Sequence, residues 1–93
     1  NTEANVAIPR VSVELGGTFI NGDALSDINA GLIQITVNQV GNTDNKGTNL
    51  LQQSSGNSLD VSFGSSPPVD GVVVNVKLLD PTIEITDIKV TLG

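Results

Sequence analysis

Carboxylates are the side chains in this sequence with the greatest capacity for chemistry. They come close together in two places: Asp23 with Asp27, and Asp80 with Glu84 and Asp87. Glycosidases use two carboxylates, one on each side of the sugar ring that they cleave. Those enzymes also need a cleft, and a chain of 93 residues with two aromatic residues seldom builds one. We therefore interpret these carboxylates as turn caps and as solvated positions on strands.

Other catalytic groups are missing or lack partners. The sequence has no His and no Cys, so it offers no imidazole base, no thiolate nucleophile and none of the usual zinc ligands. Serines in the polar segments around 54–55 and 65–66 have no activating base near them in sequence. We predict that the protein is not an enzyme, with no catalytic residue and no cofactor.

One segment has the spacing of a calcium loop. In "NTDNKG", 42 to 47, oxygen-bearing residues occupy alternate positions before a glycine. Lys46 stands at the third ligand position, and no Glu follows at the distance that an EF-hand loop requires. A cation there repels Ca²⁺, so we predict an ordinary turn and no metal site.

Charge and aromatic content argue against several classes of partner. The formal net charge is −6, and the four cations, Arg10, Lys46, Lys77 and Lys89, are spread singly along the chain. Nucleic-acid binding needs clustered Lys or Arg, so we predict no nucleic-acid partner. The absence of Trp and Tyr removes the rings on which single-stranded nucleic acids and sugars usually stack.

The beginning of the chain bears on localisation. The first residue is Asn, which predicts that an upstream segment, a secretory signal peptide, has been removed; a domain excised from a longer chain is the alternative. No apolar run approaches the roughly 20 residues of a membrane-spanning helix, so we expect no direct membrane span. We predict a secreted protein of the extracellular space or cell surface.

Apolar residues alternate with a period of two, which is typical of strands with one buried face. We predict one domain, 1–93, of the all-β class, an immunoglobulin-like β-sandwich of about seven short strands. The strands are expected at 5–15, 17–21, 31–40, 49–53, 58–64, 71–79 and 82–92. Their inner faces give the expected core: Val11, Val13, Leu15, Phe19, Leu32 or Ile33, Ile35, Val37, Leu59, Val61, Phe63, Val72, Val74, Val76, Leu78, Ile83, Ile85, Ile88, Val90 and Leu92.

Two local signals lie between the second and third of these strands. Asn21-Gly22 between apolar residues favours a type I′ hairpin turn, because both residues tolerate positive φ. The stretch "GDALSDINAG", 22 to 31, fits one helical turn with Ser26 as N-cap and Gly31 just past its end, or a plain crossover loop.

The N-terminal segment changes its hydrophobic phase. Val6 and Ile8 lie at even positions, whereas Val11 begins the alternation at odd positions. Pro9 marks the change, and it cannot donate a ladder hydrogen bond. In one interpretation the kink passes the first strand between two sheets of its own domain. In the other, residues 1–9 are an exchangeable arm that adds a strand to a neighbouring copy, and Val6, Ile8, Pro9 and Val11 are the arm set that makes the assembly contact.

The C-terminal segment changes phase as well. Ile83 and Ile85 give way to Ile88, Val90 and Leu92 across Asp87, which predicts a bulge. We expect a long final strand whose edge, at Ile88, Val90 and Leu92, is available for pairing with another chain.

A short stretch resembles a fibre-forming family. "QVGNTDN", 39 to 45, resembles the QxGxxN rung of curli-type subunits, and "QSSGN", 53 to 57, resembles a second rung. The flanking strands are rich in Val and Ile, unlike that family, and no fixed period recurs. We interpret 41–49 as a loop between two strands and keep the fibre rung as the alternative.

These observations favour a structural role. The chain is similar in style to fimbrial and pilin β domains, which implies a self-assembling subunit of an extracellular filament, a pilus or fimbria, joined by β-strand contacts. Its partners would be further copies or another surface-fibre subunit. The alternatives are a small binding or spacer module of a secreted adhesin involved in cell adhesion, and the globular part of a pilin that docks on a separate helical chain.

Overall fold

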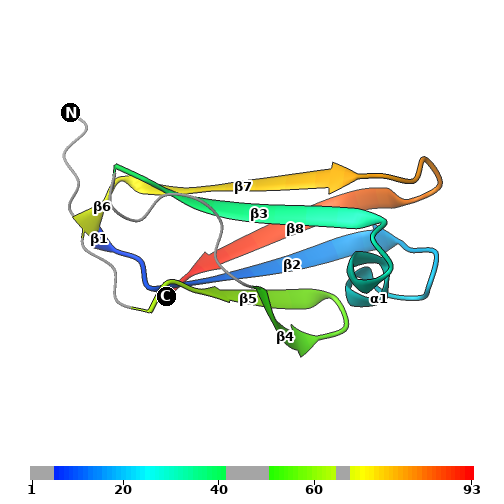
Figure 1. Ribbon diagram of the computed structural model, residues 1–93, viewed down its shortest axis with the longest axis horizontal. Coiled ribbons are helices and arrows are strands. Elements are labelled where there is room, and N and C mark those ends of the chain that lie inside the picture. Colours follow the sequence, from blue (N-terminus) through cyan, green and yellow to red (C-terminus); the bar gives the residue numbers. More distant parts are fainter. Residues whose placement is uncertain (1–5, 42–50, 65–67) are drawn as a thin grey trace.

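The computed structural model describes residues 6–41, 51–64 and 68–93, and the described chain is mostly β-strand (Figure 1). This confirms the predicted all-β class. Residues 42–49 of the predicted loop, the calcium-like segment with Lys46 and residues 42–45 of the curli-like stretch lie outside the described residues, whereas its second rung, 53–57, begins in β4. In chain order the elements are β1 (Val6–Ala7), β2 (Arg10–Thr18), α1 (Ala24–Asn29), β3 (Ile33–Val40), β4 (Leu51–Ser55), β5 (Ser58–Ser62), β6 (Pro68–Val69), β7 (Gly71–Leu78) and β8 (Glu84–Leu92).

The strands form one large antiparallel sheet and two smaller ladders. The large sheet has the order β4-β5-β2-β8, so β4 and β8 are its edges. The second sheet pairs β3 with β7 in an unbroken register from Ile33 opposite Leu78 to Val40 opposite Gly71. The two-residue strands β1 and β6 pair with each other at one end of the molecule (Figure 1).

The core lies between the two larger sheets. Alternate residues of β2, β3 and β5 supply most of it, as their hydrophobic alternation predicts. Half-buried residues of β7 pack against it from one side. The buried apolar residues are Ile8, Val11, Val13, Leu15, Ala24, Ile33, Ile35, Val37, Leu59, Val61, Phe63, Val69 and Ile83.

A bulge separates the two halves of β8, as its change of phase predicts. Gly16 of β2 lies opposite Asp87 and Gly17 lies opposite Ile85, so Thr86 is the extra residue. Gly17 has φ +155°, and a Cβ there would collide with the carbonyl oxygen of Glu84. Only glycine fits this close approach of two backbones.

The helix α1 lies in the crossover from β2 to β3, and this confirms the helical alternative for 22–31. Its C-terminus ends where predicted, in a Schellman motif: Gly31 has φ +80° and donates to the Ile28 carbonyl, and Leu32 donates to the Asp27 carbonyl. With six residues, α1 is far too short to cross a membrane, and the described chain contains no other helix.

The predicted N-cap and hairpin were wrong. Asp23, and not Ser26, caps α1, because its carboxylate accepts the Ser26 N–H at 2.8 Å. Asn21-Gly22 is no type I′ turn, since no residue other than glycine has positive φ in the described chain. Instead the N–H groups of Ile20 and Asn21 bind the Asp27 carboxylate, which pulls this segment toward the helix.

Four residues expected in the core are exposed. Leu78 is 38% exposed, and Ile88, Val90 and Leu92 are 47%, 41% and 51% exposed. All four lie on strands with an open edge in their sheets, β7 and β8. Conversely Ala24 and Val69 are buried although their short elements gave no alternation to find them by, and Ile8, between β1 and β2, is buried as well.

Candidate functional site

The edge strand β8 carries an exposed apolar row made of Ile88, Val90 and Leu92, here called the β8 row. In the sheet register these residues lie opposite Leu15, Val13 and Val11 of β2, respectively. Directly opposed residues of paired strands point to the same face, so the β8 row continues the inner, apolar face of the sheet. The three β2 residues are at most 1% exposed, whereas those of the β8 row are 41–51% exposed.

The backbone of the β8 row faces the open edge. Arg10 and Gly93 exchange both of their backbone hydrogen bonds, at 3.2 and 3.0 Å. Because hydrogen-bonded and non-hydrogen-bonded pairs alternate in an antiparallel ladder, Leu92, Val90 and Ile88 direct their N–H and C=O groups away from β2. Each residue of the β8 row therefore offers an apolar side chain and a backbone edge that no other described strand pairs with.

The predicted arm residues lie at the end of the sheet where β8 finishes. Val6 pairs with Val69 across β1 and β6 of the same domain, and Ile8 is 3% exposed. The Ile8 carbonyl accepts the Gln39 side-chain amide at 3.1 Å, which anchors the segment to β3. Pro9 marks the passage into β2, as the first interpretation of the kink expects.

The arm and the edge meet at one pair of residues. Val11, the last residue of the predicted arm set, lies directly opposite Leu92, the last residue of the β8 row. The Pro9 carbonyl accepts the Phe63 N–H at 2.7 Å, so the arm also contacts the end of β5. The structure thus brings the two predicted sets together at this pair, where Val11 is buried and Leu92 is exposed.

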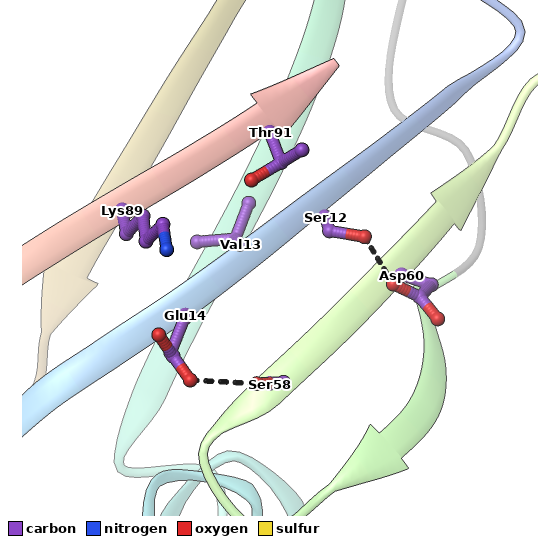
Figure 2. Close-up of a pocket in the computed structure, with 7 residues that line it drawn as sticks. All are labelled: Ser12, Val13, Glu14, Ser58, Asp60, Lys89 and Thr91. Carbon is purple, nitrogen blue, oxygen red and sulfur yellow. Dashed lines mark hydrogen bonds between the residues drawn. The ribbon is translucent and has the colours of Figure 1, made fainter. Parts of the chain in front are cut away.

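The outer face of the same sheet carries a polar hollow that the sequence analysis did not single out. It has a volume of about 340 Å³ and is lined by residues of β2, β5 and β8 (Figure 2). Within it the Ser12 hydroxyl donates to Asp60 at 2.5 Å, and the Ser58 hydroxyl donates to Glu14 at 3.4 Å. The polar half of the alternation in β2 and β5 was the sequence signal for this face.

Among the predicted carboxylates, Asp23 and Asp80 accept hydrogen bonds as caps, as interpreted from the sequence, whereas Asp27 is buried and is not a solvated position. Asp27 is fully buried and accepts three hydrogen bonds from Ile20 and Asn21, at 2.8–2.9 Å, as a structural anchor. Asp80 accepts from the hydroxyl and N–H of Thr82, and these bonds lower its pKa. Across 6–41, 51–64 and 68–93, no three acidic residues come together in a way that could hold a metal ion.

Comparisons with known proteins do not identify a functional site in this chain. No family model matches the chain, and neither the curated proteins nor the solved structures give a match. The β8 row combines three exposed apolar side chains with outward-facing backbone groups. We therefore take this edge as the candidate functional site.

Proposed function

We propose that this protein is a structural subunit of an extracellular or cell-surface filament, similar to a pilus or fimbria, which assembles through β-strand contacts. The observation that carries the proposal is the β8 row. An edge strand with unpaired backbone groups is a template for pairing with another chain, and an exposed apolar row adds buried area to that pairing.

The β8 edge lacks most of the devices that keep natural edge strands apart. Folded proteins usually protect edges with short strands, prolines, charged side chains, bulges, inward-pointing charges or a covering segment, and of these β8 has a bulge and Lys89. β8 has nine residues and no proline, and its charged residues past the bulge, Asp87 and Lys89, belong to the outer face. An edge of this kind supports a role in assembly.

The N-terminal arm supplies a route to growth beyond a pair. Val6 and Ala7 form only a two-residue ladder, and Ile8 fills a site in the core. A neighbouring copy could fill the same site with its own Ile8, which preserves every contact while linking two subunits. A head-to-tail exchange of this kind does not close on itself and therefore propagates.

The polar hollow supports a second candidate, a binding or spacer module of a secreted adhesin. Glu14, Asp60 and Lys89 there offer both charge signs on a rigid sheet. This alternative expects a monodisperse monomer that binds a ligand through the hollow. The filament proposal expects self-association without any ligand.

Negative-stain microscopy of the purified chain tests the proposal. We expect filaments from the intact chain, and a folded product without filaments after deletion of residues 1–9. The matched control replaces residues 1–5 alone with a Gly/Ser segment, which keeps Ile8, and should still polymerise. Filaments that persist unchanged after the deletion would show that the arm is not the connector. An intact chain that never polymerises and occurs only as a monomer would overturn the structural role.

A further inference from the structure

We propose that β8 pairs antiparallel with β8 of a second copy, about a two-fold axis that passes beside Val90. The inference rests on the proposed self-association through strand edges and specifies its partner, direction and register. It follows from the positions of apolar, charged and glycine residues on the two faces of β8 and its neighbour β2.

The inner face fits this register. A two-fold axis beside Val90 places Val90 opposite its own copy and Ile88 opposite Leu92 of the second copy. Every member of the β8 row then has an apolar partner across the seam. Behind them lie Leu15, Val13 and Val11 of each β2, which are already buried. The two apolar faces would thus join into one continuous surface.

The outer face fits the same register. Lys89 lies opposite Thr91 of the second copy, and on its other side it lies opposite Glu14 of its own β2. Asp87 lies opposite Gly93 of the second copy, whose other neighbour is Arg10. Because Gly93 has no side chain, the Arg10 guanidinium of one copy can reach over it toward the Asp87 carboxylate of the other. Arg10 already borders Gly93 on this face.

The neighbouring two-fold registers fit less well. An axis beside Lys89 sets Lys89 opposite its own copy, and like charges directly opposite each other destabilise a pair of strands. An axis beside Ile88 sets Val90 opposite Thr86 and Leu92 opposite Glu84, which places a carboxylate against the apolar face. An axis beside Thr91 pairs Val90 with Leu92 and sets none of the described residues opposite Ile88.

The proposed contact has a defined consequence for assembly. It is isologous, so it closes as a dimer and joins the two four-stranded sheets edge to edge. It cannot by itself propagate a filament. Growth would then need the separate head-to-tail contact of the N-terminal arm, and the dimer would be its repeating unit.

Single cysteines give a direct test, because the natural sequence has none. In a hydrogen-bonded antiparallel pair the opposed Cα atoms are about 5.5 Å apart, within the range of a disulfide. Val90→Cys should therefore form a disulfide-linked dimer under mild oxidation. Ile88→Cys is the matched control on the same strand: its two copies would lie four residues out of register, about 14 Å apart, and should not cross-link.

A mixture sharpens the test of register. Ile88→Cys and Leu92→Cys should cross-link with each other when mixed and not with themselves, as read by non-reducing mass analysis. Cross-linking of Ile88→Cys with itself as efficiently as Val90→Cys would indicate a parallel, in-register contact and would overturn the proposal. Failure of Val90→Cys to cross-link, with the chain monomeric by light scattering at high concentration, would overturn it as well.

Charge reversal tests the outer face. Arg10→Glu should weaken the dimer by about tenfold, since two symmetric charge pairs are lost and replaced by repulsion. Asp87→Lys in the same chain should restore most of the affinity, and Lys77→Glu on β7 should leave it unchanged. If the double variant is no tighter than Arg10→Glu, the predicted pairing of Arg10 with Asp87 is wrong.

The experiments distinguish a failure of the proposed β8 dimer from a failure of the proposed filament role. A chain that cross-links at Val90 but gives no filaments supports the β8 contact and counts against the filament role. Filaments from a chain in which Val90→Cys never cross-links and Arg10→Glu has no effect would uphold the filament role and overturn this contact.

Discussion

The inner face of the large sheet is apolar on both β2 and β8, yet the two strands differ completely in burial. Leu15 of β2 and Ile88 of β8 are direct partners in the ladder, and they are 1% and 47% exposed. The two positions share a face, a sheet and a residue class. They differ in position, since β2 is an inner strand of the sheet and β8 is one of its edges.

This difference teaches that alternation identifies the inner face of a strand without showing that the face is covered. Where two sheets pack face to face, the central strands of one sheet lie against the other sheet. An edge strand is covered only if the opposite sheet extends over it. An apolar row left open on an edge is a site for a further strand, and the core that it would extend is already present beside it.

The largest expected effect comes from the covered side. Phe63→Ala should cost about 3–5 kcal/mol, because the buried ring leaves a void that a core with few aromatic residues cannot refill. Phe63 is 7% exposed, and Leu79, at 45%, is the matched apolar control. Denaturant unfolding should separate the two variants clearly. Equal losses would mean that the described burial is wrong.

The opposed pair itself gives the second test. Leu15→Ala should cost about 2–5 kcal/mol, because its side chain is fully buried, whereas Ile88→Ala should cost well under half as much. Both variants should be measured at protein concentrations low enough to keep the chain monomeric. A cost for Ile88→Ala equal to that of Leu15→Ala would show that β8 is covered in solution. The difference in burial between the two strands would then be wrong.

A third variant tests the crossover that brings β3 over β2. Asp27→Asn should cost about 1–3 kcal/mol, because the amide nitrogen replaces an acceptor where N–H donors converge. The buried carboxylate holds Ile20 and Asn21 beside α1. Asp87→Asn, on the exposed outer face, is the control and should be nearly neutral in the monomer. A neutral result for Asp27→Asn would show that the Asp27 carboxylate does not anchor this segment.

The smallest expected effect concerns the cap of the same helix. Hydrogen bonds from Ser26 lower the pKa of Asp23 below its ordinary value of 3.8. Between the two pKa values the unfolded chain binds more protons at Asp23 than the folded chain does. The stabilisation by the cap is therefore complete above the ordinary pKa and is lost as pH falls through the lower pKa of the folded chain. Melting temperatures from about pH 5 to about pH 2 should fall less for Asp23→Ser than for the natural chain. Equal slopes would contradict the cap.

Some of the candidate site was predictable because it depends on local chemistry. The phase change across Asp87 indicated the bulge, and the apolar positions of β8 indicated which side chains share a face. The position of Gly31 indicated the end of α1, since a left-handed residue is needed there. The exposure of the β8 row had no local signal, because exposure depends on what another sheet covers.

Period-two alternation and turn residues predicted the all-β class, the longer strands and most of the inner faces from the sequence alone, although the separate strand expected at 17–21 is absent because β2 runs on to Thr18. Only the tertiary structure decided that Asp27 is buried, that Asn21-Gly22 turns toward a helix, and that Ile8 enters the core while Val90 stays open. The physical reason is that neighbours in sequence determine a residue's backbone conformation and the face on which its side chain lies. Burial is set instead by segments distant in sequence that pack against it.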